Sequence, residues 1–276
     1  MAMNNFQWGA MQTKLNIGVL ISGGGSNLQA IIDASEEGRL KANVVCVGAD
    51  NNAAKGLTRA AKHQIPSFVV DYDHIISQAK TDPDGVKLPS DLQMSELVSR
   101  IMSTRPNQNP EKIKTMINTR IAAEIELLER LSKYPIDLLV LAGFMRTLTP
   151  YFIDRINPTS KRPRIMNIHP SLLPAFPGVD GYGDTIRYGC KVGGCTVHFV
   201  DEGEDTGPII GQSSFDIEAS DDLDSIKRKG LQAEWRLYPK CIQYAAEGRL
   251  RVVAKVYKLK NGRQFTRKIV EVLPKL

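Results

Sequence analysis

The stretch of sequence that decides the fold is residues 15–32, which read LNIGVLISGGGSNLQAII. Its first part, Leu15–Ile21, is a mostly apolar run, which is typical of a strand buried on both faces of a parallel sheet. The glycine-rich turn Ser22–Asn27 follows, and apolar side chains then recur at helical spacing up to Ile32. A strand, a glycine-rich turn and an amphipathic helix in this order indicate an α/β fold.

The rest of the chain continues this alternation of strand-like and helix-like segments. The pattern favours a mostly parallel central sheet flanked by helices. The predicted strands cover residues 44–48, 67–70, 137–141, 164–168, 194–200 and 208–215, and the predicted helices cover residues 53–62, 90–102, 111–131 and a segment that begins near Ser220.

The last predicted helix carries two specific expectations. Ser220 is expected to be its N-cap, which would place Asp221 and Asp222 in the first turn, where the helix dipole favours negative charge. Pro239 lies further along the same segment and is expected to restart or kink the helix, because proline cannot donate a backbone hydrogen bond.

The chain divides into three parts. Residues 1–14 are expected to be an N-terminal tail, and residues 15–253 form the α/β domain. Residues 254–276 are expected to be a C-terminal β-hairpin, because Asn261-Gly262 is a strong signal for a two-residue turn. Within the domain, the polar residues 71–110 are expected to be an insertion or a mobile lid, since so long a polar stretch is unusual in a compact domain.

Bulk composition excludes several classes of protein. The chain has 276 residues, of which 42% are hydrophobic and 24% charged, as in an ordinary globular protein. No apolar run approaches the roughly 20 residues that span a bilayer, and the N-terminus lacks the order of a secretory signal. The net charge is +6, but the basic residues are dispersed, without the stripe expected for nucleic acid. We therefore expect a cytoplasmic protein that binds neither membranes nor nucleic acid.

The four cysteines give no sign of a disulfide framework or of a metal site. Cys46, Cys190, Cys195 and Cys241 are scattered through segments expected to be core, and none forms a CxxC pair. The absence of both features fits a reducing cytoplasm.

The glycine-rich turn has a functional and a structural interpretation. Glycines let a backbone approach a ligand closely, and the following helix start offers unpaired N–H groups, so the turn is a candidate phosphate cradle. It resembles the start of a dinucleotide fingerprint, but Leu28 replaces the last glycine. Asp50, at the end of the second strand, keeps a dehydrogenase open as an alternative. A plain tight turn between strand and helix is the structural alternative.

A second group of polar residues follows the later strands. Asn167 and His169 lie on the same side of a predicted strand and emerge at its carboxyl end, where open α/β sheets bind ligands. Asp205 lies in an acidic loop between two later strands. Acyl transfer to an amine needs a donor for the oxyanion, which an amide supplies, and a proton carrier, which a His–carboxylate pair supplies. A histidine beside a proline and a simple Asp-Thr-Gly-Pro turn are the structural alternatives.

Four segments carry a resemblance to a known family. Residues 20–32 and 141–148 read LISGGGSNLQAII and LAGFMRTL, while residues 167–174 and 194–210 read NIHPSLLP and GCTVHFVDEGEDTGPII. With these segments the chain resembles the phosphoribosylglycinamide formyltransferases, which are folate-dependent enzymes of purine synthesis. The resemblance implies a Rossmann-like formyltransferase fold. It also implies transfer of a formyl group from 10-formyltetrahydrofolate, as co-substrate, to the amine of glycinamide ribonucleotide.

The resemblance also assigns residues to roles. It implies catalysis by Asn167, His169 and Asp205, and contact between Glu234 and the glycinamide substrate. It further implies that two groups of residues bind the substrate phosphate and the folate, because they match the family's phosphate loop and the segments around its pterin. They are Gly25, Ser26 and Asn27 for the substrate phosphate, and Met145, Arg146, Thr147, Leu148, Asp201, Glu202, Gly203 and Glu204 for the folate, largely through the backbone.

Related activities remain as alternatives. The hydrolase that deformylates the same carrier and methionyl-tRNA formyltransferase share the 167–174 segment. The triple-glycine loop argues against the tRNA enzyme, and the short stretch before Leu15 argues against the hydrolase, which usually carries an N-terminal regulatory domain. A formyltransferase for another phosphorylated amine and a non-enzymatic nucleotide-binding protein are further alternatives. We expect small-molecule substrates only, no metal, and a monomer or a homodimer.

The chain departs from the family in three places, one of which is the C-terminal hairpin, by which it exceeds a compact family member. Residues 179–184 read VDGYGD, where the family commonly places a histidine-containing helix start, and this puts contacts on the folate side in doubt. Residues 71–110 replace a region that can contribute an arginine near the folate, so no such residue is assigned.

Overall fold

The computed structural model describes residues 14–83, 85–104, 109–157, 159 and 162–275. Almost the whole of the predicted tail, residues 1–14, therefore lies outside the described residues. Among the described residues, no helix combines the length and the apolar character that a membrane crossing requires. Within the same ranges, no group of three or more His, Cys, Asp or Glu side chains is arranged to hold a metal ion.

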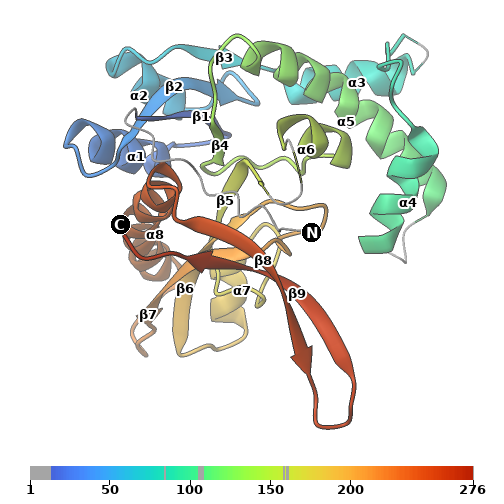
Figure 1. The fold of residues 1–276 in the computed structure, drawn as a ribbon. Helices are drawn as coiled ribbons and strands as arrows, with labels where there is room; N and C mark the ends of the chain where they lie inside the picture. The colour runs from blue at the N-terminus through green and yellow to red at the C-terminus, as the bar shows by residue number, and fades with distance from the viewer. Residues whose placement is uncertain (1–13, 84, 105–108, 158, 160–161, 276) are drawn as a thin grey trace.

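A seven-stranded sheet forms the centre of the molecule, in the order β3-β2-β1-β4-β5-β6-β7 (Figure 1). The first five strands along the chain pair in parallel, whereas β6 and β7 are antiparallel. The predicted strand positions are confirmed to within a few residues. The strands are β1 Leu15–Ile21, β2 Ala42–Ala49, β3 Ser67–Val69, β4 Leu138–Leu141, β5 Ile165–His169, β6 Val192–Phe199 and β7 Ile209–Asp216.

Helices cover both faces of this sheet. Alternate residues of β1 face opposite ways: Val19 packs in one apolar core with residues of α1 and α8, whereas Leu20 packs in a second core with residues of α5 and α6. The mostly parallel α/β architecture predicted from the sequence is thus confirmed. The helices are α1 Ser26–Glu36, α2 Gly56–Lys62, α3 Tyr72–Thr81, α4 Met94–Thr104, α5 Pro110–Leu131, α6 Pro150–Ile156, α7 Gly181–Arg187 and α8 Leu223–Ala246.

The polar segment 71–110 contains two helices. α4 matches the short helix predicted near residues 90–102, but α3 was not predicted. Its start is fixed by the Asp71 side chain, which accepts a hydrogen bond from the backbone N–H of His74 at 3.0 Å. α4 and the first half of α5 share a small apolar core of their own, formed by Leu97, Ile101, Ile113, Ile117 and Ile121.

Helix α8 begins later than predicted. Its N-cap is Asp222, not Ser220, because Asp222 and Ser225 form a reciprocal capping box: the backbone N–H of Ser225 donates to the Asp222 carboxylate at 2.7 Å, and the backbone N–H of Asp222 donates to Ser225 Oγ at 2.9 Å. Asp221 and Asp222 therefore lie outside the first turn. The helix also continues through Pro239 and does not restart there.

The C-terminal hairpin projects from the body as an arm (Figure 1). It consists of β8 Leu250–Lys258 and β9 Gln264–Val272, so it begins before the predicted boundary at residue 254. The expected two-residue turn is wrong. Leu259 bonds to Arg263, which leaves a three-residue loop that ends at Gly262, whose φ is 81°.

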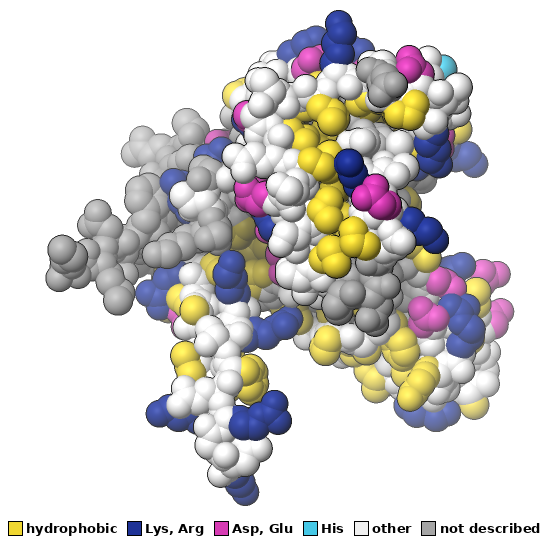
Figure 2. Space-filling model, turned by 90° about the vertical axis from the view of Figure 1, so that its right-hand side faces the viewer, with side chains coloured by type: hydrophobic (Ala, Val, Ile, Leu, Met, Phe, Trp, Pro, Cys, Tyr) yellow, Lys and Arg dark blue, Asp and Glu magenta, His cyan; other side chains and the backbone are white. Residues whose placement is uncertain are grey.

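The arm carries the excess positive charge of the chain. Residues 250–272 include seven Lys and Arg residues and one Glu, a net +6, which equals the net charge of the whole sequence. Figure 2 shows basic side chains along the arm, with apolar ones beside them. Val256 and Phe265 are among the exposed apolar residues of the hairpin. The expectation that positive charge is dispersed is therefore wrong, although the prediction that nucleic acid is not bound stays untested.

Candidate active site

A cavity of about 640 Å³ opens at the carboxyl ends of β1, β4 and β5. The sheet order reverses between β1 and β4, and such a switch point leaves a crevice in which α/β proteins bind ligands. The sequence-predicted site residues converge here. The lining includes the glycine turn 22–27, the β4 loop (residues 142–148), Asn167, His169, residues 178–182, His198, the β6 loop (residues 200–206, of which 200–205 line the cavity) and Glu234.

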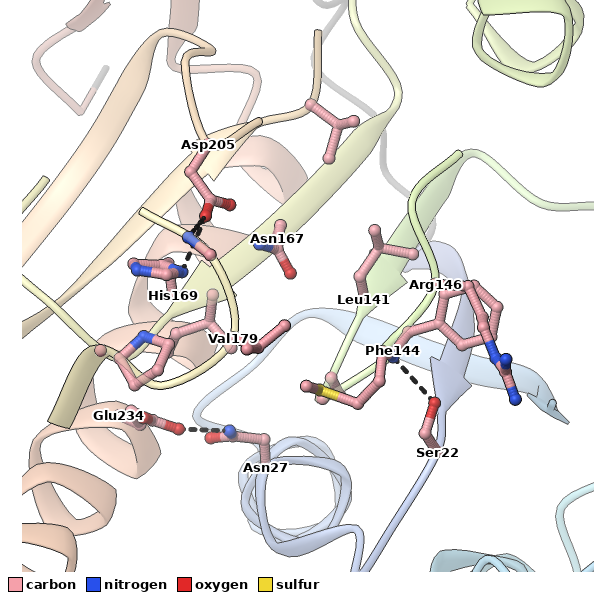
Figure 3. Close-up of a pocket in the computed structure, with 18 of the residues that line it drawn as sticks. Ser22, Asn27, Leu141, Phe144, Arg146, Asn167, His169, Val179, Asp205 and Glu234 are labelled. Carbon is pink, nitrogen blue, oxygen red and sulfur yellow. Dashed lines mark hydrogen bonds and ion pairs between the residues drawn. The ribbon is translucent and has the colours of Figure 1, made fainter. Parts of the chain in front are cut away.

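The predicted trio is held together by a fourth residue, His198 of β6. Asp205 lies between two imidazoles: its Oδ2 is 3.2 Å from His169 Nδ1, and its Oδ1 is 3.6 Å from His198 Nε2. The Asn167 amide nitrogen is 3.1 Å from His198 Nε2. Asn167, His198, Asp205 and His169 thus form one connected polar cluster, and Figure 3 shows its predicted members at one end of the cavity.

The hydrogen bonds of His198 fix the orientation of Asn167. His198 Nδ1 lies 2.9 Å from the carbonyl oxygen of Phe199, and a carbonyl can only accept, so Nδ1 carries a proton. In the neutral ring Nε2 is then an acceptor, and Asn167 must present its NH₂ group to it. One N–H of the amide is used in this bond, and the second N–H is left for a ligand.

His169 and Asp205 form a buried pair that can hold a proton between them. His169 Nε2 donates to the carbonyl oxygen of Phe176 at 2.8 Å, which leaves Nδ1 facing the carboxylate. Burial lowers the pKa of His169, and the negative charge of Asp205 opposes this shift. Burial raises the pKa of Asp205, but the nearby His198 imidazole and the hydrogen bond from the Gly178 backbone outweigh it, so the pKa is lowered and the carboxylate is ionised at neutral pH.

The backbone of the β6 loop places the Asp205 side chain. Asp205 has φ 53°, in the left-handed region that Asp tolerates better than most residues. The backbone N–H of Gly178 donates to Asp205 Oδ2 at 2.8 Å. Gly207 follows, and a Cβ there would lie 1.8 Å from the carbonyl oxygen of Phe199. The loop can therefore turn back toward β7 only with glycine at this position.

The glycine turn forms the opposite end of the cavity. Gly25 caps α1 with φ 68°, and a Cβ there would meet the backbone of Gly56 at 2.7 Å. The first helical bond runs from Gln29 N–H to the Gly25 carbonyl, so the N–H groups of Ser26 and Asn27 have no partner within the helix. An anion at this position would be held by backbone N–H groups and by the helix dipole.

The Asn27 side chain is already engaged. Its Nδ2 donates to Glu234 Oε2 at 2.5 Å, and the Tyr182 hydroxyl donates to Glu234 Oε1 at 2.6 Å (Figure 3 shows the first bond). Burial raises the pKa of Glu234, although both hydrogen bonds oppose the shift. The predicted phosphate contact of Asn27 therefore has to be made by its backbone, while Glu234 lies beside it as an acceptor group.

The predicted folate residues lie along the third side of the cavity. The backbone N–H of Met145 donates to Ser22 Oγ at 2.8 Å, which ties the β4 loop to the glycine turn. The Arg146 side chain points away from Asn167 in Figure 3 and pairs with Asp50 and Asp73. Residues 145–148 and 201–204 all line the cavity, so the prediction of largely backbone contacts remains open at these positions.

The structure argues against the dehydrogenase alternative, because Asp50, the acidic residue that it requires, is not available to a ligand. Asp50 is 1% exposed, accepts hydrogen bonds from Arg146 Nε at 2.5 Å and from Asn51 Nδ2 at 2.7 Å, and so has no free surface for a ribose hydroxyl. The position that suggested a dinucleotide-binding protein instead anchors the β4 loop.

Sequence reasoning missed two residues of the site. His198 lies opposite Asn167 in the antiparallel pairing of β5 and β6, so an assumed register between these strands could have found it. Tyr182 lies in the unusual 179–184 segment, at the start of α7. It reaches Glu234 because residue 230 is glycine: a Cβ there would lie 2.1 Å from Tyr182 Cζ. No local pattern signals that fit.

Comparisons with known proteins agree with this geometry. The family model described as formyl transferase matches residues 15–242. A Haemophilus influenzae protein named phosphoribosylglycinamide formyltransferase is 33% identical over 236 residues, which cover 86% of this chain and 89% of that protein. The crystal structure of glycinamide ribonucleotide transformylase 1 from Symbiobacterium toebii has a TM-score of 0.69 at 33% identity, and the match covers 96% of both chains.

Larger relatives contain the same unit. The trifunctional purine biosynthetic protein adenosine-3 of Chironomus tentans is 34% identical over 241 residues, which are 87% of this chain but only 14% of that protein. The chain thus spans about one seventh of the length of these relatives. The match over residues 15–242, together with the fold and the cluster around Asn167, establishes that the chain belongs to the formyl transferase family.

Proposed function

We propose that this protein transfers a formyl group from 10-formyltetrahydrofolate to the amine of glycinamide ribonucleotide. One observation carries the proposal: the Asn167–His198–Asp205–His169 cluster and the N–H groups of the glycine turn line the same cavity. A substrate whose phosphate lies at the turn can extend its amine toward the cluster. The names of the relatives supply the acceptor and the formyl group that is transferred, and the folate donor is what membership of the formyl transferase family implies.

The cluster supplies the groups that the reaction needs. In the transfer, a bond forms between the formyl carbon and the substrate nitrogen, the bond from that carbon to the carrier nitrogen breaks, and one proton passes from the first nitrogen to the second. The free N–H of Asn167 donates to the formyl oxygen as it becomes negative. The His169–Asp205 pair accepts the proton from the amine and returns it to the departing nitrogen.

The other residues that line the cavity bind different parts of the two substrates. The N–H groups of Ser26 and Asn27 hold the phosphate, together with Gly25. Glu234, fixed by Tyr182 and Asn27, accepts hydrogen bonds from the body of the phosphorylated substrate. The β4 and β6 loops, with residues 145–148 and 201–204, enclose the folate. We expect the enzyme to act in the cytoplasm as a monomer or homodimer, without a metal.

The test is an assay of the purified protein with the folate donor, with and without glycinamide ribonucleotide. We expect formylated product only when the acceptor is present. Asn167→Ala should lower kcat by about 10²–10³, which is typical for one oxyanion donor, while circular dichroism and melting remain those of the wild type. Release of formate without the acceptor would instead identify a hydrolase, and wild-type turnover of the variant would remove Asn167 from the mechanism.

A further inference from the structure

Two loops border the predicted folate end of the cavity: the β4 loop, residues 142–148, and the β6 loop, residues 200–206. Both receive charged contacts from the same polar segment, residues 71–110, whose helices α3 and α4 lie outside the sheet (Figure 1). The described residues of this segment, 71–83, 85–104, 109 and 110, contribute no side chain to the cavity lining. Its effect on the site must therefore pass through the loops that it holds.

The contact with the β6 loop is made by Arg100 of α4. Its Nη2 and Nε donate to Glu202 Oε1 at 2.7 and 3.2 Å. The same guanidinium binds Asp154 of α6 in a two-pronged arrangement, at 2.7 and 3.0 Å. Because the Arg100 side chain is only 25% exposed and four of its hydrogen bonds converge on two carboxylates, it links the loop rigidly to the body.

The contact with the β4 loop is made by Asp73 of α3. Its two carboxylate oxygens accept from Arg146 at 2.9 and 3.0 Å, while Arg146 Nε donates to the buried Asp50. The Arg146 guanidinium also lies 5.5 Å from the ring centroid of Tyr72. The side chain of Arg146 is thus held on the outside of the loop, which turns the backbone of residues 145–148 toward the cavity.

Apolar packing keeps α4 in position to make its contact. Leu97 and Ile101 of α4 are buried against Ile113, Ile117 and Ile121 of α5, and Tyr151 of α6 packs at the edge of this group. Helix α5 in turn packs on the sheet through a second apolar core. The charged contact of Arg100 is therefore made from a fixed helix and not from a free loop.

We propose that the segment 71–110 is a brace for the folate end of the cavity, with Arg100 and Asp73 as positioning residues. The inference rests on the proposed function. Arg100 holds Glu202, three positions before Asp205, whose φ of 53° is sustained by its surroundings. Loss of Arg100 lets the β6 loop relax, which displaces the backbone that encloses the folate and the carboxylate that pairs with His169.

The test compares Arg100→Gln with a matched control, Arg155→Gln. Arg155 of α6 pairs with Asp91, so it also ties the segment 71–110 to α6. Among the described residues, no hydrogen bond or ion pair joins Arg155 to the β6 loop, which Arg100 contacts through Glu202. We expect Arg100→Gln to raise the KM for the folate donor about three- to tenfold, as for loss of a charge-assisted contact that is partly exposed. The KM for glycinamide ribonucleotide and the values of Arg155→Gln should stay within twofold of the wild type.

A second readout needs no turnover. Hydrogen–deuterium exchange of the free protein should show faster uptake over residues 200–206 in Arg100→Gln and unchanged uptake there in Arg155→Gln. Arg100→Lys should restore part of the protection, since lysine keeps the charge but cannot bind two carboxylates in a planar fork. Equal uptake in the two glutamine variants overturns the brace, whereas absence of formyl transfer in the wild type overturns only the proposed function.

Discussion

Because Tyr182 packs directly against Gly230, we predict that replacing this glycine by alanine has the opposite effect on stability from the one usual in a helix. Gly230 lies inside α8, where replacing glycine by alanine normally stabilises a helix by about 0.5–1 kcal/mol. In this protein a Cβ at residue 230 would lie 2.1 Å from Cζ and 2.3 Å from the hydroxyl oxygen of Tyr182. Gly230→Ala should therefore destabilise the protein.

The size of the effect follows from two losses. Overpacking of a well-filled site costs about 1–3 kcal/mol. Displacement of Tyr182 also breaks its 2.6 Å hydrogen bond to Glu234, and a hydrogen bond to a charged group contributes about 1.5–3 kcal/mol. After the helix-propensity gain is subtracted, the net loss is about 2–5 kcal/mol. At about 2–4 °C per kcal/mol for a domain of this size, Tm should fall by about 4–20 °C.

The assay is thermal and urea unfolding of the wild type, Gly230→Ala, Tyr182→Ala and the double variant. Removal of the Tyr182 ring creates room for the new methyl group, so Gly230→Ala should become neutral or stabilising in the Tyr182→Ala background. A Gly230→Ala protein at least as stable as the wild type would refute the reasoning. The gain in helix propensity alone would then account for the measured change in stability, with no cost from a clash with Tyr182.

Two further predictions concern the helix cap and a buried carboxyl group. Asp222→Ala should cost about 1 kcal/mol, whereas Ser220→Ala should leave the free energy of unfolding unchanged; urea unfolding of both variants checks this. Glu124 is fully buried, and burial raises its pKa to about 7. The folded state then binds more protons than the unfolded state, so stability should fall as pH rises from about 4.5 to about 7. Glu124→Gln should flatten that part of the curve of Tm against pH, and an unchanged slope would contradict the assignment.

Local patterns predicted the parts of the site that lie on one strand or one turn. The apolar run Leu15–Ile21, the glycine turn and the helix after it are neighbours in sequence, so their order alone predicts the strand–turn–helix unit that brings the turn to the cavity. The placement of Asn167 and His169 at one end of β5 follows from strand alternation in the same way. Asp205 required only that the next strands return to the same edge of the sheet.

The remaining features depend on contacts between distant segments. His198 joins the cluster through the register of β5 and β6, which periodicity does not determine. Tyr182 reaches Glu234 only because Gly230, far along the chain, leaves space. The Arg146 side chain turns outward because Asp50 and Asp73 hold it. Each of these depends on tertiary structure that composition and spacing leave undetermined.

The N-cap of α8 shows a different reason why a sequence-based prediction fails. Ser220 and Asp222 are both good cap residues, and the choice between them is decided by the residue three positions later: Ser225 completes a reciprocal bond with Asp222. Helix α3 was missed although Tyr72 and Ala79, which are buried, have helical spacing. The many polar residues around them hid the periodicity.

The projecting hairpin makes the molecule an electric dipole. Because residues 250–272 carry a formal +6 and the whole sequence also carries +6, the remaining residues sum to zero. Mutual repulsion between copies in solution thus originates almost entirely at one end of the molecule. Without this arm the protein would be close to its isoelectric point at neutral pH, where colloidal stability is lowest.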